Sequence, residues 1–366
     1  MVRASSAIWL LGLAVLLAGG CAPTCDPGEV CVLIGTGELG FNGDGLPGPE
    51  TALASPTAVR EAPDGRPLVV DFSNMRVRVL DADGVVSTLV GEGIHAYSEP
   101  GVAALDSPLE NPVDARWGPD GLLYIAPLHE GRIVRVSEDG LIERVAGTGE
   151  NLETSGDGGP ALDATMGYPA GIAWGSDGTL YVSDNTNHRV RAVAPDGSID
   201  TVLGTGERGF DLDGVGRAVR LSYPMQLEVV DDKLLVADSG NDRVGELDLA
   251  SGLFRTLVGT GEEGAAGDGG PAALASLSQP TGLAADEDGW LWIGDLGNGV
   301  VRQVAPDGTI STVVGADPEG TDPDGETFPA LAAPLRRPAG LALTASGELL
   351  IADRGSHRVL LWRRER

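Results

Sequence analysis

Cysteine, histidine and aromatic residues are all scarce in this chain of 366 residues, which has three cysteines, four histidines and 4% aromatics. Three cysteines are too few for a thiol-rich metal cluster. Basic residues are also few, since 25 Lys and Arg stand against 54 Asp and Glu and leave a formal net charge of −29. An acidic surface repels phosphate backbones, so nucleic acid is not an expected partner.

Long hydrophobic runs are absent except near the N-terminus, where AIWLLGLAVLLA, residues 7–18, follows Arg3. This run is shorter than the roughly 18 residues of a membrane-spanning helix. The segment AGGC, residues 18–21, resembles the lipobox of bacterial lipoproteins, although Ala18 stands where Leu is commoner. The resemblance implies cleavage before Cys21, lipidation of its thiol and, because Ala22 follows, an outer-membrane lipoprotein. An ordinary secretory signal is the alternative.

Residues 1–20 are therefore expected to be a signal peptide and residues 21–29 a short tether. The other two cysteines, Cys25 and Cys31, lie in CDPGEVC, where Pro27 and Gly28 can turn the chain back. In an oxidising compartment they are expected to form a small disulfide, the alternative being two free thiols.

A repeat fills the rest of the chain. A glycine that follows an apolar pair recurs every 55 to 57 residues, at Gly35, Gly91, Gly147, Gly204, Gly259 and Gly315. Each unit holds four short β-rich runs separated by Gly/Asp turns, which in the third unit are residues 168–174, 179–184, 187–194 and 198–204. Six units of four strands predict an all-β fold, a six-bladed β-propeller over residues 30–366, expected to be monomeric.

The two ends of the chain predict how the ring closes. The sixth unit stops at its third strand, residues 358–366, and VCVLIG, residues 30–35, matches the end of a fourth strand. The N-terminal strand is therefore expected to complete the last blade, which leaves no open sheet edge.

The repeated pieces resemble the NHL repeat family. They are GTG, GDGGPA, P-x-G-[IL]-A and L-[YLW]-[VI]-x-D-x-x-N-x-R-V-R, best preserved over residues 147–204. The resemblance implies a six-bladed propeller used as a binding scaffold. It also leaves a second class open, because a few relatives are lyases or hydrolases, and fold alone does not choose between the two.

Residues present in nearly every blade are interpreted as architecture. Asp at the end of the second strand can bond turn amides, and the Arg at the start of the third strand, such as Arg76 and Arg189, can pair with acids. The Gly-rich stretch between blades is interpreted as a connector. Its aspartates remain weak calcium candidates, and no other cofactor is expected; they are Asp44, Asp157, Asp213, Asp268 and Asp324.

Blade two departs most from the pattern. It has Ala126-Pro127 instead of the strand-end Asp and a turn, residues 128–131, that is expected to be one residue longer. His95, His129 and Glu130 of this blade are ligand candidates. The histidine spacing matches no zinc site, so solvated loop histidines are expected, and the same holds for His188 and His357.

The first strand of each blade lines the channel, and alternate positions share one face. Three blades place Gly and Ala there, whereas the other three carry polar side chains at the same positions: Arg60, Asp114, Arg116, Gln226 and Glu228. These five are either a polar ligand pocket at the channel mouth or structural pairs around channel water, since unpaired burial is costly.

The preferred function is a membrane-anchored binding scaffold without catalysis, with a protein, small-molecule or glycan ligand. The alternative is a lyase or hydrolase at the channel end on the crossover face, which carries the loops between blades and the second-to-third-strand turns. The tether and the C-terminus are expected on the opposite face, here called the hairpin face. Eight tether residues after the lipid span at most about 28 Å, so the hairpin face is expected to look toward the membrane.

Overall fold

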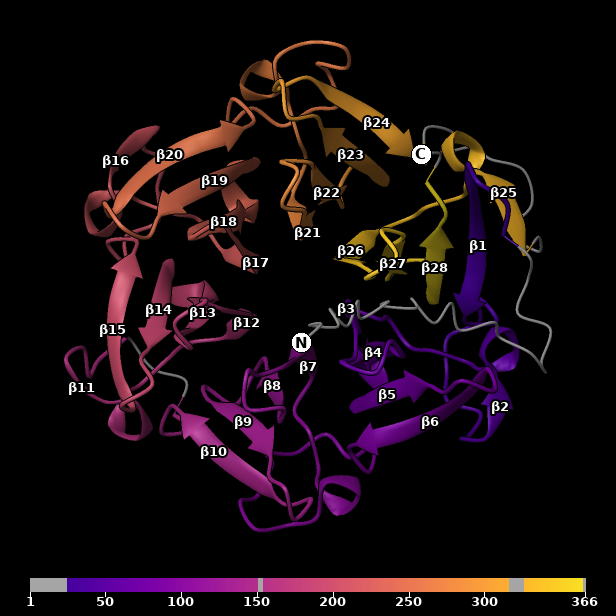
Figure 1. Cartoon of the computed structure of the whole chain (residues 1–366). Helices are drawn as coiled ribbons and strands as arrows, with labels where there is room; N and C mark the ends of the chain where they lie inside the picture. The colour runs from indigo at the N-terminus through magenta and orange to yellow at the C-terminus, as the bar shows by residue number, and fades with distance from the viewer. Residues whose placement is uncertain (1–24, 151–153, 316–325, 365–366) are drawn as a thin grey trace, which may run out of the picture.

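The computed structural model describes residues 25–150, 154–315 and 326–364. Six antiparallel sheets stand as blades around one axis, which confirms the six-bladed propeller (Figure 1). Each blade has four main strands, which run outward in chain order in the first five blades, while the last blade takes its outer strand from the start of the chain. The inner strands are β3 (Ala58–Glu61), β7 (Pro112–Trp117), β12 (Pro169–Trp174), β17 (Pro224–Val230), β21 (Pro280–Ala285) and β26 (Pro338–Leu343).

The remaining strands follow in the same order. The second strands are β4 (Pro67–Asp71), β8 (Leu123–Pro127), β13 (Leu180–Asp184), β18 (Lys233–Asp238), β22 (Leu291–Asp295) and β27 (Leu349–Asp353). The third strands are β5 (Arg76–Leu80), β9 (Ile133–Val136), β14 (Arg189–Val193), β19 (Arg243–Asp248), β23 (Val300–Val304) and β28 (Arg358–Trp362). The outer strands are β6 (Val85–Val90), β10 (Ile142–Ala146), β15 (Ser198–Leu203), β20 (Leu253–Val258), β24 (Ile310–Val314) and β1 (Glu29–Ile34).

Short elements in the connections add to this plan. Four blades gain a fifth strand from the incoming connection, outside the expected four: β2 (Leu46–Pro47), β11 (Gly159–Pro160), β16 (Asp213–Val215) and β25 (Thr327–Pro329). Single 3₁₀ turns lie between strands: η1 (Gly48–Glu50), η2 (Phe72–Asn74), η3 (Ala104–Asp106), η4 (Ala161–Asp163), η5 (Asn185–Asn187), η6 (Gly216–Ala218), η7 (Ser239–Asn241), η8 (Ala272–Leu274) and η9 (Ala330–Ala332).

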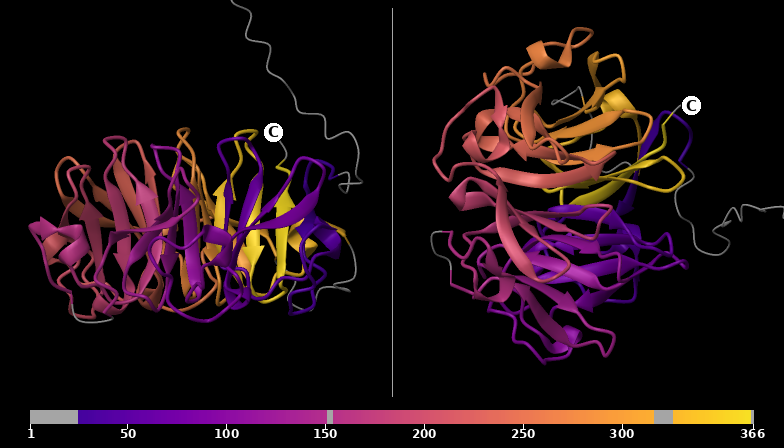
Figure 2. Two further views of the ribbon diagram at one scale, coloured as in Figure 1. Left: turned by 90° about the horizontal axis from the view of Figure 1, so that it is seen from below. Right: turned by 60° about the vertical axis from the view of Figure 1, so that its left-hand side comes forward.

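Closure of the ring follows the sequence prediction. Strand β1 lies antiparallel between β28 and β25, with Val30 opposite Trp362, so the first strand completes the last blade (Figure 1). The backbone N–H of Gly28 donates to the carbonyl of Arg363 (2.7 Å) and extends this pairing. Both ends of the described chain therefore meet on the hairpin face, and the edge-on view shows the C-terminus leaving the disc there (Figure 2).

The hydrophobic core is divided into clusters between neighbouring blades. Leu68 and Val77 of blade one pack with Leu109 and Ile125 of blade two, and equivalent clusters fill the other blade interfaces. Ile34 of β1 lies in the cluster between blades six and one, where it is fully buried. The closing strand therefore contributes apolar burial, worth about 1.5–3 kcal/mol for such a side chain, as well as hydrogen bonds.

Hydrogen bonds on the crossover face also join blades. The residue before the third strand has a positive φ, and in blades three, four and six its side chain accepts the backbone N–H of the residue before the next blade's first proline. Nδ1 of His357 accepts from Ser55 (3.1 Å), and Oδ1 of Asp242 accepts from Gln279 (2.7 Å). The expectation of solvated loop histidines at this position is wrong, because each imidazole is needed as an acceptor between blades.

Candidate functional site

The polar side chains of the inner strands meet inside the channel. Nη2 of Arg60 lies 2.8 Å from Oδ1 of Asp114, and both side chains are almost fully buried. Asp114 also accepts the backbone N–H of Ile172 in blade three (3.1 Å), and Arg60 donates to the carbonyl of Leu341 in blade six (2.9 Å). Burial and the nearby Arg116 charge lower the pKa of Arg60. This pair thus holds the inner strands of four blades together.

The other three channel residues are bonded in the same way. Arg116 pairs with Glu228 at 2.7 Å across the channel, and Nε2 of Gln226 donates to the carbonyls of Leu283 (2.6 Å) and Leu341 (3.1 Å). Glu228 keeps 23% of its side chain exposed and Arg116 keeps 15%. The layer therefore plugs the channel, with the Arg116–Glu228 pair as its more accessible part.

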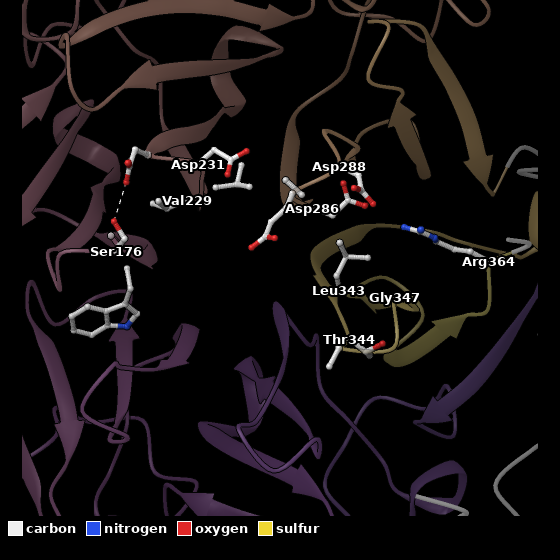
Figure 3. A pocket seen from close by; sticks show the side chains of 16 residues that line it. Ser176, Val229, Asp231, Asp286, Asp288, Leu343, Thr344, Gly347 and Arg364 are labelled. Carbon is white, nitrogen blue, oxygen red and sulfur yellow. Dashed lines mark hydrogen bonds between the residues drawn. The ribbon is translucent and has the colours of Figure 1, made fainter. Parts of the chain in front are cut away.

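A wide cavity, here called the vestibule, opens from this plug to the hairpin face. It has a volume of about 940 Å³ and is lined by the hairpins that join first and second strands in blades three to six (Figure 3). Its charged lining is mostly acidic: Asp231, Asp232, Asp286, Glu287 and Asp288, with Arg364 at the rim. A second chamber of about 480 Å³ adjoins it and reaches Arg60, Arg116 and Glu228.

An aromatic wall stands where the two chambers meet. Trp174 lines both, and Trp117 lines the inner chamber. Trp174 packs edge-to-face on Tyr124, with ring centroids 4.8 Å apart. Its indole Nε1 is buried and has no hydrogen-bond partner among the described residues. An unsatisfied buried donor is uncommon in a folded protein, and here it lies beside a cavity.

The blade-four hairpin holds its acids in an unusual backbone conformation. Asp231 and Asp232 form the two-residue turn between Val230 and Lys233, and both have positive φ, 48° and 55°. Such turns usually contain Asn-Gly or Asp-Gly, because Gly takes positive φ without strain. Asp231 thus stands at a position where Asp is common, whereas Asp232 occupies the position that usually holds glycine.

A small cavity of about 50 Å³ lies at the opposite end of the channel, between Thr57, Asp114, Gln226 and Arg354. This cavity has little room for a substrate, so it does not support the alternative of a catalytic pocket at this end. Arg60, Arg116 and Glu228 instead line the inner chamber next to the vestibule, whereas Asp114 and Gln226 face the small cavity.

The connector aspartates make contacts within their own blades. Asp44, Asp157 and Asp268 each bond a fully buried Arg of the third strand, at 3.0, 2.6 and 2.7 Å. Those arginines are Arg78, Arg191 and Arg302. Asp213 instead accepts the backbone N–H of Thr256 (3.1 Å), and Asp324 lies outside the described residues.

The first Arg of the third strand pairs with an acid in two blades, as expected: Arg132 with Glu130 (3.0 Å) and Arg243 with Asp238 (2.7 Å). In blade three the first Arg, Arg189, instead donates to the carbonyl of Thr205 (2.7 Å). The second, Arg191, is fully buried between Asp157 and Asp184. The repeated strand-end Asp accepts a backbone N–H, as Asp184 does from Gly167 (2.7 Å). Asp157, Arg191 and Asp184 thus form a buried clamp inside blade three, and blades one and five have the same arrangement.

The alignment of blade two needs a correction. Pro127 pairs with Pro112 in the same register as Asp184 with Pro169, so Pro127 occupies the strand-end Asp position. The turn over residues 128–131 therefore has the ordinary length, and the expected extra residue is absent there.

Glu130 takes over the role of the missing aspartate in blade two. It is fully buried and accepts both the backbone N–H (2.8 Å) and the hydroxyl (2.7 Å) of Ser98. It also accepts the backbone N–H of Glu110 (3.3 Å) and pairs with Arg132 (3.0 Å). Burial raises its pKa. The structure thus gives Glu130 a framework position, away from any cavity described above.

The two histidines of blade two lie close together on the crossover face, on either side of a carboxylate that sequence inspection missed. Nε2 of His95 is 2.9 Å and Nδ1 of His129 is 3.1 Å from Oε1 of Glu110. The His129 ring packs edge-to-face on Tyr168 at 4.8 Å. This group is a second candidate site, on the opposite face from the vestibule.

The N-terminal segment carries a disulfide. Cys25 and Cys31 are bonded, with Cα atoms 5.8 Å apart, and tie the start of β1 into a small loop. Cys21 lies outside the described residues. Within the parts of the chain that the structure describes, no helix has the length and apolarity to cross a bilayer.

Comparison with known proteins supports an NHL-type β-propeller. A model of the teneurin NHL domain matches residues 100–194 and 138–240, and a model of the NHL repeat matches residues 335–360. Teneurin-m of Drosophila melanogaster is 29% identical over 84% of this chain, which spans 12% of that protein. NHL repeat-containing protein 2 of Bos taurus is 31% identical over 64% of this chain, which spans 36% of it.

Solved structures at low sequence identity share the fold. An auxiliary nutrient binding protein from Bacteroides thetaiotaomicron superposes with a TM-score of 0.66 at 13% identity, over 91% of this chain and 75% of that one. A streptogramin B lyase gives a TM-score of 0.53 at 14% identity, over 87% of this chain and 96% of that one. Proteins with different activities thus share this architecture, so function has to be argued from the site.

Proposed function

We propose that this protein is an extracytoplasmic, membrane-anchored propeller that binds a cationic ligand in the vestibule without catalysis. The observation that carries the proposal is the vestibule of about 940 Å³ with five carboxylates from the hairpins of blades four and five. A concave surface lined by one sign of charge concentrates the field and attracts the opposite charge. The same fold in a Bacteroides auxiliary nutrient binding protein shows that the architecture is compatible with a binding role.

The lining also indicates the kind of cation. Trp174 and Trp117 offer aromatic faces beside the carboxylates, and a cation over such a face gains about 0.5–2 kcal/mol, depending on its desolvation. The Arg116–Glu228 pair at the floor can exchange partners with a polar group of the ligand. We infer a flexible polyamine or a basic peptide segment, since several ammonium groups can then meet several carboxylates.

The noncatalytic reading follows from how the channel residues are used. Asp114 is bonded to Arg60 and to a backbone N–H, and Gln226 is bonded to two carbonyls. A general acid or base must reach the substrate within hydrogen-bonding distance. The likeness to a streptogramin B lyase is a likeness of fold, so by itself it does not support the lyase or hydrolase alternative.

Anchoring through Cys21 fits the position of β1. The described chain enters at the hairpin face, next to the end of β28, so a lipid on Cys21 would hold that face toward the membrane. Protease added to the anchored protein should cut the connector around Asp157 and spare the C-terminal residues. Cleavage of the C-terminus with an intact Asp157 connector would contradict this orientation.

The binding proposal is tested by calorimetric titration of the purified chain with spermidine. The double variant Asp231→Asn/Asp286→Asn should weaken binding at least about tenfold, equal to about 1.4 kcal/mol. A matched variant, Asp83→Asn/Asp139→Asn, removes the same charge from turns outside the vestibule and should change affinity little. Equal weakening in both variants would show that only the net charge of the protein matters and would contradict binding in the vestibule. Absence of binding by the wild type would refute the proposal.

A further inference from the structure

We propose that His95, Glu110 and His129 form a binding site for a divalent transition-metal ion of the zinc type. One ligand atom from each residue lies within 4.8 Å of the others. Zinc binds nitrogen and oxygen ligands at about 2.0–2.2 Å, so tetrahedral ligand atoms stand about 3.3 Å apart. Small side-chain rotations would therefore bring this group to bonding distance. Two imidazoles and one carboxylate favour zinc over calcium, which takes oxygen ligands.

The backbone places the three residues together through direct hydrogen bonds. The N–H of Leu109, next to Glu110, donates to the carbonyl of Ile94, next to His95 (3.3 Å). The N–H of Leu128, next to His129, donates to the carbonyl of Asn111 (3.0 Å). The Glu110 segment is thus tied to the His95 segment and to the His129 segment, each time one residue away from the ligands. A site on a preorganised backbone loses less free energy on binding.

The same three positions meet in blades four and five, where they carry no comparable ligand set. In blade four Nε of Arg208 donates to Oγ of Ser222 (3.1 Å), and in blade five Oγ of Ser278 donates to Glu263 (3.1 Å). The third position is glycine in both blades, and an added Cβ at either would collide with the serine. The propeller therefore builds this niche repeatedly, and blade two fills it with His, Glu and His.

Exposure divides the group into a buried and an open side. The Glu110 side chain is 7% exposed, whereas His95 is 54% and His129 36% exposed. Oδ1 of Asn111 lies 2.7 Å from Nε2 of His95 and offers a neutral oxygen nearby. Three protein ligands with an open side match zinc sites that keep an exchangeable position for water or another ligand.

The ion would also have a structural effect specific to blade two. In blades one, three and five a buried Arg clamps the connector Asp, as Arg78 does with Asp44. In blade two Val134 of the third strand lies opposite Ile125, and at the equivalent position in blade one Arg78 lies opposite Val69. Its connector contains no GDG segment. A metal bridge from His95 to Glu110 and His129 would fasten this connector instead.

The test is metal binding by the purified chain after treatment with EDTA. Cobalt, used as a visible probe, and then zinc, measured by competition with a chromophoric chelator, should each bind with one equivalent. His95→Gln, His129→Gln and Glu110→Gln should each weaken zinc binding by more than about a hundredfold, because loss of a ligand exceeds the 10–100-fold cost of losing an outer-shell partner. Zinc should also slow hydrogen exchange over residues 93–99.

Two control variants keep the result specific. Glu92→Gln removes a neighbouring charge, and His357→Asn removes a histidine from another blade; both should bind zinc as the wild type does. Because His95 is half exposed, His95→Gln should fold normally, which its circular dichroism checks. Absence of stoichiometric zinc uptake, or unchanged uptake in the His95→Gln/His129→Gln variant, would overturn the proposal.

Discussion

Nδ1 of His188 in blade three accepts a hydrogen bond, 3.2 Å long, from the backbone N–H of Tyr223 in blade four. The imidazole also packs edge-to-face on the Tyr223 ring at 4.7 Å. The acceptor role requires a neutral imidazole, and burial, followed by the charge of Arg208, lowers the pKa of His188. A contact between blades therefore depends on the protonation state of one ring nitrogen.

His188→Asn should remove this pH dependence, because its Oδ1 can accept the same bond at every pH, as Asp242 does from Gln279. A lowered folded-state pKa means that the stabilisation is complete above the unfolded pKa of about 6.5 and is lost as pH falls through the folded pKa. Wild type should thus lose stability relative to the variant between pH 7 and pH 5. A difference that stays constant with pH, measured by urea unfolding, would contradict the assignment.

For Asp71→Asn we expect the opposite pH dependence: the wild type should gain stability relative to the variant as the pH falls. Burial raises the pKa of Asp71 to about 6 from 3.8, so its charge opposes folding at pH 7. This opposition disappears as pH falls through 6 toward 3.8, and the wild type should gain on the order of 3 kcal/mol relative to the variant over that range. Urea unfolding at several pH values measures the gain. A relative loss on acidification would show that Arg78 keeps the carboxylate charged.

Arg191→Met should destabilise the protein by about 3–5 kcal/mol, because it leaves the buried Asp184 carboxylate without its cationic partner. The neighbouring Arg189→Met serves as the control and should cost about 1 kcal/mol or less, since Arg189 donates only to a carbonyl. Blade five already carries Val300 at the Arg189 position while keeping Arg302. Equal losses in the two unfolding curves would contradict the division of roles.

Ile34→Ala should destabilise the whole ring by about 2–5 kcal/mol, because the side chain is fully buried where blades six and one meet. Leu33→Ala, at a half-buried position of the same strand, should cost less. The unfolding transition should remain single, since the strand belongs to the closing blade. An unchanged melting temperature for Ile34→Ala would contradict closure through β1.

Much of this fold could be predicted because the same pattern of four strands recurs in six units of the sequence. The order of strands and the closing role of residues 30–34 follow from spacing alone. The arginine partner of each buried acid was harder to predict, because Arg189 and Arg191 lie on the same strand. Only the structure shows that the Arg191 side chain points between Asp157 and Asp184. The place of Pro127 at the strand-end Asp position was missed for a similar reason, because only the strand register, and not the residue type, identifies that position.

The sites were harder to predict than the framework. Glu110 precedes the proline of β7 by two residues, where the other blades have unrelated residues, so only the structure brings it between two histidines. The vestibule acids lie on hairpins that look like ordinary turns in sequence. Only the structure shows that these hairpins bring acids such as Asp231 and Asp286 to the same cavity (Figure 3).

Hydrogen exchange of the chain with and without spermidine tests the vestibule most directly. The hairpins at residues 229–233 and 285–290 should exchange more slowly with ligand, while the connectors at residues 41–50 and 155–165 should not change. This pattern would place binding on the hairpin face, as the carboxylates of blades four and five require. Protection confined to the crossover face, or no protection at saturating spermidine, would contradict the account.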